Sequence, residues 1–205
     1  MRKANRAFFL APLMVTLVFA AAVAGGYLAG WISPNEDFHL GSVRSHVKAP
    51  SFDLIDGDGV HRTLEDFHDR IVVIFFGFTR CPDACPSELF KLAQVMKRLG
   101  PSGKQVQVLL VTLDPERDTP YLMKNYVAAF NPSFIGLTGT PAQIRRVTEA
   151  YHVFHTRRPV GSDYTIYHTT LTYVIDGRGR QRLLGRMTNS IDDFVHDLQE
   201  LATQG

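Results

Sequence analysis

A run of apolar residues at positions 71–78, Ile-Val-Val-Ile-Phe-Phe-Gly-Phe, is the centre of the hydrophobic pattern. Seven of these eight residues are apolar, and all seven are β-branched or aromatic. A short run of this kind is typical of a β-strand that is buried on both faces of a helix-covered sheet. After Thr79 the pattern breaks at Pro82 and Pro86, and Ser87 is a candidate capping residue. These residues predict that the strand leads directly into a helix.

The rest of the pattern alternates between strand and helix. Residues 52–63 predict a hairpin around the turn Asp56-Gly57-Asp58-Gly59, and residues 64–68 predict a helical turn. Apolar periodicity then predicts strands at 106–113 and 134–137, a hairpin at 171–184, and helices at 87–99, 121–130, 140–151 and 191–201. This order is typical of an α/β domain. Because the central strand leads into two cysteines at a helix start, we expect a thioredoxin-like fold: a mixed central sheet flanked by helices, with extra hairpins.

The N-terminal region has the pattern of a membrane anchor. Residues 1–6 form a basic flank, and residues 7–32 follow with 26 positions that carry no charge. A spanning helix needs roughly 20 apolar residues, whereas the apolar part of a signal peptide usually has about 7–15. Alanine triplets near position 22 leave a cleaved signal peptide as the alternative. We expect an uncleaved single-pass anchor in a bacterial inner membrane, with a cytoplasmic N-terminus and a periplasmic domain.

Residues 33–49 are polar and lack clear periodicity, so we expect a tether there and a folded domain at 50–205. Three of the 22 Lys and Arg residues lie in the basic flank, which leaves 19 against 20 acidic residues in the rest of the chain. This balance gives no basic face for nucleic acid.

Cys81 and Cys85 are the only cysteines, and both lie where the central strand passes into the helix. A separation of four positions places their Cα atoms about 6 Å apart on one helical face. That spacing allows a disulfide and equally allows both sulfurs to bind one metal ion. A disulfide across so short a loop stabilises the fold by only roughly 2 kcal/mol. We therefore expect reactive or metal-binding thiols. Because the periplasm oxidises exposed thiols, a reductant or a bound metal is needed there to keep the pair functional.

Four segments together resemble the Sco/SenC family: residues 76–86 with both cysteines, residues 113–120, residues 136–139, and Tyr167-His168-Thr169. Members of that family are membrane-anchored, thioredoxin-like copper chaperones that assemble the dinuclear copper site of cytochrome c oxidase. The resemblance covers about residues 50–201. It implies copper ligation by Cys81, Cys85 and His168, and as partner the copper-binding subunit of the oxidase. Other periplasmic copper carriers or thiol reductases are further candidate partners. The chain departs from the family at Tyr167 and Thr169, where Asp and Ser are common.

Two thiolates and one imidazole favour Cu(I), with Cu(II) as the alternative oxidation state, and structural zinc would need four ligands. A copper chaperone is therefore the leading hypothesis. A thiol–disulfide reductase that keeps the recipient's cysteines reduced is the second, although such enzymes usually have two residues between their cysteines. A cysteine peroxidase ranks last.

We expect His152 and His155 at the surface. We also expect the loop at 114–118 to be a self-contained turn, with Arg117 paired locally and Asp118 capping the next helix.

Overall fold

The protein is described here by a computed structural model in which residues 38–43 and 47–204 are defined. The basic flank expected at 1–6 and the anchor expected at 7–32 lie outside these residues. Within the described part of the chain, no helix is both long and apolar enough to cross a membrane.

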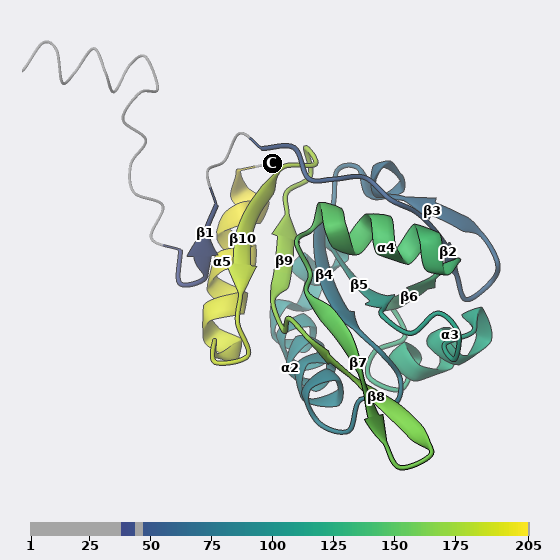
Figure 1. The fold of residues 1–205 in the computed structure, drawn as a ribbon. Coiled ribbons are helices and arrows are strands. Elements are labelled where there is room, and N and C mark those ends of the chain that lie inside the picture. The colour runs from purple at the N-terminus through teal and green to yellow at the C-terminus, as the bar shows by residue number, and fades with distance from the viewer. Residues whose placement is uncertain (1–37, 44–46, 205) are drawn as a thin grey trace, which may run out of the picture. The chain divides into compact units, whose positions relative to one another are not determined.

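An eight-stranded mixed sheet forms the centre of the domain (Figure 1). The strand β4 (Ile71–Gly77) is buried at every position and pairs in parallel with β5 (Val106–Thr112). On the other side of β4 lies the antiparallel strand β9 (Thr172–Ile175). The remaining strands extend the sheet in both directions, in the order β1-β10-β9-β4-β5-β6-β2-β3: β1 (Gly41–Ser42), β2 (Asp53–Asp56), β3 (His61–Thr63), β6 (Ile135–Thr138) and β10 (Gln181–Gly185).

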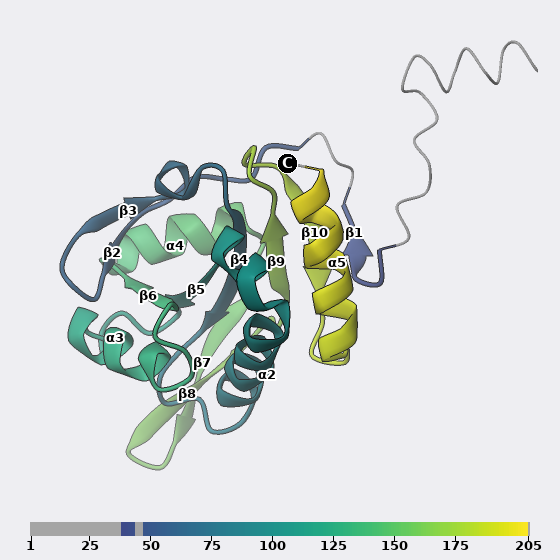
Figure 2. The ribbon, with the colours of Figure 1, turned by 180° about the vertical axis from the view of Figure 1, so that it is seen from behind.

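Helices cover both faces of this sheet. The helices α2 (Ala84–Leu99) and α5 (Ile191–Thr203) lie on one face, and α4 (Pro141–Ala150) lies on the other (Figures 1 and 2). The helix α3 (Pro120–Ala128) packs against β6 and β2. Two short 3-10 helices, η1 (Leu64–Phe67) and η2 (Gly100–Gln105), precede β4 and β5. The mixed α/β prediction is thus confirmed, with parallel pairing at β4–β5–β6 and antiparallel pairing toward both edges.

The start of α2 differs from the sequence prediction. The helix begins at Ala84, with Asp83 at the cap position, so Ser87 lies within the helix and is not its cap. Pro86 is the third helical residue, where its missing N–H is no loss because the first turn has no partner for that group. The earlier start places Cys85 in the first turn of the helix.

A further hairpin, which the hydrophobic pattern did not predict, is formed by β7 (His155–Val160) and β8 (Asp163–His168). It is a separate two-stranded sheet that extends beyond the end of the central sheet (Figure 1). Most of its residues are exposed or half-buried, so its strands lack the alternation of apolar and polar residues that marks a half-buried strand.

The described part of the expected tether belongs to the folded domain. The strand β1 pairs with β10, and the side chain of Leu40 is 3% exposed in the core. The buried carboxylate of Asp197 on α5 accepts hydrogen bonds from the backbone N–H groups of His39, at 3.0 Å, and Leu40, at 2.8 Å. Residues 38–43 therefore pack with the domain that we expected to begin at Pro50. These contacts are long-range and leave no local periodicity in the sequence.

This docking gives a first prediction. The Leu40→Ala substitution should lower the free energy of unfolding by about 2–4 kcal/mol, because it removes a buried side chain and leaves a cavity. The matched control is Val47→Ala, whose side chain is 56% exposed and whose loss should cost less than about 0.5 kcal/mol. Urea unfolding of the full chain in detergent, followed by circular dichroism, measures both values. Equal effects of the two substitutions would show that residues 38–43 do not dock on the domain.

Candidate metal centre

The turn between β4 and α2 brings the two cysteines together. The Cys81 N–H donates to the Phe78 carbonyl oxygen at 3.2 Å, which closes the turn after the strand. The backbone N–H of Cys85 then donates to the Sγ atom of Cys81 at 3.4 Å. Both thiols are free, Cys81 half-buried and Cys85 buried. The sequence prediction that the two sulfurs lie side by side is confirmed in geometry.

His168 reaches the same place from the end of β8. Its Nε2 atom lies 3.8 Å from the Sγ atom of Cys85, although the two residues are 83 positions apart in the chain. Its Nδ1 atom lies 2.8 Å from the carbonyl oxygen of Thr169. Because a carbonyl oxygen only accepts hydrogen bonds, Nδ1 carries the proton and Nε2 keeps its lone pair on the side of the sulfurs.

Cys81, Cys85 and His168 together form what we call the thiol–imidazole cluster. Their ligand atoms all lie within 4.8 Å of one another, so one metal ion could contact all three. The imidazole ring packs edge-on against Phe75 and Phe78, with ring centroids 6.3 and 5.9 Å away. These contacts fix the ring plane.

Gly77 makes room for the cluster at the end of β4. A Cβ atom at this position would lie 2.7 Å from the Sγ atom of Cys85, closer than a carbon and a sulfur can approach. Any other residue would therefore push the buried thiol away from its neighbours. The signal was present in the sequence, since Gly77 is the one residue that interrupts the apolar run at 71–78.

The two thiols differ in acidity. A hydrogen bond from the Cys85 thiol, with smaller contributions from nearby backbone N–H groups, lowers the pKa of Cys81 to about 4 against the opposing effect of partial burial. The hydrogen bond to Cys81 and its own burial raise the pKa of Cys85. The reduced pair is thus a half-exposed thiolate at Cys81, stabilised by a buried thiol at Cys85.

The loop after β5 fixes the cysteine turn in place. The carboxylate of Asp118 is buried, and it accepts hydrogen bonds from the Thr79 backbone at 3.1 Å, the Thr79 hydroxyl at 2.6 Å and the Thr112 hydroxyl at 2.6 Å. The prediction that Asp118 caps the next helix is wrong, because Thr119 is the cap of α3. Asp118 instead connects the residues just before Cys81 to the end of β5.

The same loop also holds the hairpin that carries His168. Arg117 pairs with Asp114, as expected for a local pair, but it also contacts Asp163 at 2.8 Å. Its guanidinium stacks on the ring of Tyr164, 3.7 Å from the centroid, and the Tyr164 hydroxyl donates to Asp114 at 2.8 Å. The loop is therefore not the self-contained turn that the sequence suggested.

The other candidate residues lie around the cluster or away from it. A hollow of about 340 Å³ is lined by Cys81, His168 and the exposed residue Tyr167, together with neighbouring residues of the turn and of β8. Asp83 accepts a hydrogen bond from the Ser87 hydroxyl and is no part of the cluster. His152 is exposed, as predicted, whereas His155 is half-buried and lies opposite His168 in the hairpin.

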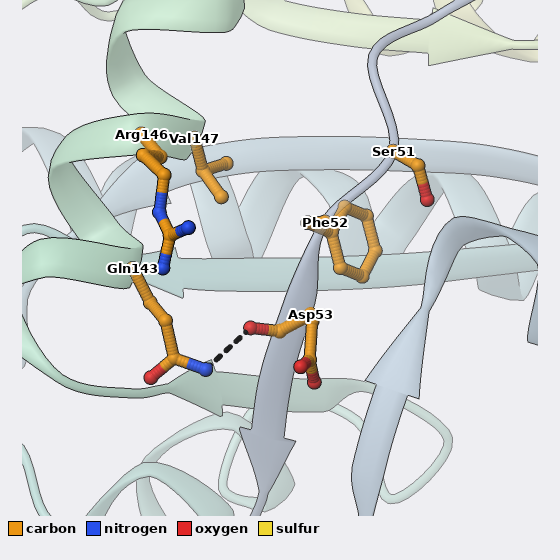
Figure 3. Close-up of a pocket in the computed structure, with 6 residues that line it drawn as sticks. All are labelled: Ser51, Phe52, Asp53, Gln143, Arg146 and Val147. Atoms are coloured by element: carbon orange, nitrogen blue, oxygen red, sulfur yellow. Dashed lines mark hydrogen bonds between the residues drawn. The ribbon is translucent and has the colours of Figure 1, made fainter.

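A second hollow, between α4 and β2, has a different character (Figure 3). Gln143 donates from its side-chain amide to the Asp53 carbonyl oxygen at 2.9 Å, and this bond joins the helix to the strand. No cysteine or histidine lines it, so it offers none of the ligands of the thiol–imidazole cluster.

The domain is mixed α/β and thioredoxin-like, with two thiols at a helix start and an imidazole opposite them. These features are typical of a class of metal-binding or dithiol proteins. Within that class, the chain belongs to the SCO1/SenC family, whose sequence profile matches residues 42–203.

Individual relatives agree with this assignment. The bovine protein SCO2 homolog, mitochondrial, is 34% identical over 198 residues, which cover 87% of this chain and 74% of the relative. The structure of ScoI from Bradyrhizobium japonicum with copper bound superimposes with a TM-score of 0.70 and 35% identity, covering 76% of this chain and 99% of that one. The protein BsSco, described as a member of the Sco family of cytochrome c oxidase assembly proteins, shares the fold at a TM-score of 0.65 and 21% identity, over 80% and 99% of the two chains.

The difference in thiol acidity gives a second prediction. In the reduced, metal-free protein, alkylation of Cys81 by iodoacetamide should persist to below pH 6, because a thiol with a lowered pKa stays ionised above about pH 4. The Cys85→Ala substitution removes the largest cause of the shift, so the midpoint of the pH profile should rise by at least about one unit. Mass spectrometry of the alkylated peptide measures both profiles. A wild-type midpoint near the free-cysteine value of about 8.5 would contradict the prediction.

Proposed function

We propose that this protein is a membrane-anchored copper chaperone that binds copper through Cys81, Cys85 and His168 for assembly of the dinuclear copper site of cytochrome c oxidase. The observation that carries the proposal is the thiol–imidazole cluster, in which two sulfurs and one imidazole nitrogen lie within 4.8 Å of one another. Two thiolates and an imidazole suit Cu(I), a soft ion that accepts few ligands, better than they suit Zn²⁺, which prefers four.

Family membership supports the same reading. ScoI of Bradyrhizobium japonicum was solved with copper bound, and BsSco is described as one of a family of cytochrome c oxidase assembly proteins. By this reasoning the recipient is the copper-binding subunit of an oxidase. The half-exposed Cys81 at the hollow beside Tyr167 is then the ligand that a recipient reaches first, while the buried Cys85 holds the ion from below.

A thiol–disulfide reductase is the second candidate, and the acidity of Cys81 favours it. The Cys81 thiolate would attack one sulfur of a recipient disulfide and release the other sulfur as a thiolate. Cys85 would then pass its proton to the released recipient thiolate and attack the Cys81 sulfur of the mixed disulfide, which expels the second recipient sulfur as a thiolate that water protonates. The recipient leaves as a dithiol, and the two electrons come from the Cys81–Cys85 pair, which ends as a disulfide.

The proposed copper site predicts the copper affinity of the protein and its variants. Anaerobic titration of the reduced full chain in detergent should give one tightly bound Cu(I) per chain. The Cys81→Ser and Cys85→Ser substitutions should each weaken binding at least about a hundredfold, because one thiolate and one imidazole leave the ion under-coordinated. His155→Ala is a matched control, since His155 lies directly opposite His168 but outside the cluster. Competition with a chelator of known affinity measures the constants. Wild-type affinity in either serine variant would overturn the site assignment.

The His168→Ala substitution distinguishes the two candidate functions. Dithiol exchange does not need His168, whereas copper binding uses its lone pair, so His168→Ala should weaken copper binding and still let the Cys81–Cys85 pair form and reduce disulfides. In cells that lack the native protein and grow at limiting copper, oxidase assembly should fail nearly as badly as with Cys81→Ser. The readout is oxidase activity in isolated membranes. Near-normal assembly, with loss of copper binding verified in vitro, would support the reductase role instead.

The expected membrane anchor can also be tested. If residues 7–32 hold the protein in the inner membrane, the mature protein should retain its N-terminal residues and partition with membranes after a carbonate wash. N-terminal sequencing of the purified protein tests this directly. A mature chain that begins near Gly25 would mean a cleaved signal and no anchor.

A further inference from the structure

A second group of metal-ligating side chains lies where the first described residues meet the last helix. His196 and Asp197 are neighbours on α5, and His39 lies in the segment just before β1. Each of the three offers one ligand atom, and these atoms lie within 4.8 Å of one another. Among the described residues, this group and the thiol–imidazole cluster are the two that meet this criterion.

The two imidazoles of this group lie face to face. The rings of His39 and His196 stack with centroids 4.2 Å apart and planes inclined by 10°, and each side chain is 48% exposed. An imidazole binds a metal ion in its own ring plane, along a nitrogen lone pair, so the two rings must turn toward a common point to hold one ion. Because a first-row divalent ion lies about 2.1 Å from each ligand, its donors are at most about 4.2 Å apart. Half-exposed rings can make the remaining small shift without disturbing the core.

Two carboxylates surround the rings. The Nδ1 atom of His196 lies 2.9 Å from Asp197, and the Nδ1 atom of His39 lies 3.4 Å from Asp193, one helical turn before Asp197. The buried carboxylate of Asp197 also accepts the N–H groups of His39 and Leu40, which hold it in one orientation. Its Oδ2 atom accepts the Leu40 N–H, whereas its Oδ1 atom accepts the His39 N–H and lies 2.9 Å from the His196 Nδ1 atom. An ion that replaced the Nδ1 contact would use Oδ1 as its ligand. Neutral imidazoles beside two carboxylates give a net charge that complements a dication.

We propose that His39, His196 and Asp197 form a second metal site that takes a divalent first-row ion and fastens residues 38–40 to α5. The donors are nitrogen and oxygen only, so the site suits Zn²⁺, Ni²⁺ and Cu²⁺ and does not suit Cu(I), and Cu²⁺ is bound most tightly of the three. The ligands come from both ends of the described domain, and α5 and β1 lie at the same edge of the sheet (Figures 1 and 2). This site does not depend on the proposed function of the thiol–imidazole cluster.

The experiment uses the full chain in detergent with Cys81→Ser and Cys85→Ser, so that no thiol can bind or reduce Cu²⁺. Titration with copper sulfate should give one tight Cu²⁺ per chain, and its electron paramagnetic resonance spectrum should show coupling to two imidazole nitrogens. Adding His39→Ala or His196→Ala should weaken this binding at least about tenfold. The matched control is His61→Ala, because His61 is an exposed imidazole 2.8 Å from Asp53 that belongs to neither ligand group of the described residues.

Folding is checked in the same variants. The His39→Ala change leaves the backbone bond to Asp197 in place, so its Tm without metal should stay within about 2 °C of the parent. Saturating Zn²⁺ should then raise the Tm of the parent by several degrees and that of the His39→Ala variant by much less. If His39→Ala proves unstable, His39→Gln replaces it. Unchanged Cu²⁺ binding without His39, coupling to one nitrogen only, or an equal loss in His61→Ala would each overturn the proposal.

Discussion

The geometry of the thiol–imidazole cluster depends on one buried carboxylate, that of Asp118. A buried carboxylate is strongly unfavourable unless hydrogen bonds replace the water it loses, and Asp118 receives three such bonds from Thr79 and Thr112. These bonds fix the residues before Cys81 to the end of β5. Four residues earlier, Asp114 holds Arg117 and the Tyr164 hydroxyl, which fix the hairpin of His168. A single loop therefore sets the position of donors that lie more than 80 residues apart.

The packing around the cluster sets how far each thiol is exposed to solvent. Gly77 allows the strand backbone to approach the Cys85 sulfur, and the core closes over that thiol completely. Cys81 stays half-buried at the hollow that Tyr167 borders. One sulfur is thus rigid and dry while the other faces solvent. An ion at the proposed site would have one ligand fixed in the core and one near the surface, an arrangement that suits transfer to a second protein.

The sequence predicted the central strand, the cysteine turn and most helices because each depends on local signals: the apolar run at 71–78, the prolines that follow it, and the threonine cap before Pro141. His168 was found only through the family resemblance, since its place depends on a polar hairpin without apolar alternation. The role of Asp118 was missed because an acidic residue before a helix has the same local pattern as a cap. The docking of Leu40 was missed because its partners, α5 and β10, are about 140 or more residues away.

The two candidate functions use the same reduced dithiol and differ in what they require of His168. The Cys85 thiol is the largest cause of the low pKa of Cys81, so the dithiol pair would keep its acidic member without the imidazole. What the imidazole adds is a lone pair at Nε2, whose orientation the Thr169 carbonyl fixes through Nδ1. In thiol exchange this lone pair, 3.8 Å from the buried sulfur, could accept the Cys85 proton, and at a Cu(I) ion it would be the third ligand. Because water can also take the proton, whereas nothing else in the cluster replaces the ligand, the position of this ring on a separate hairpin favours the copper role.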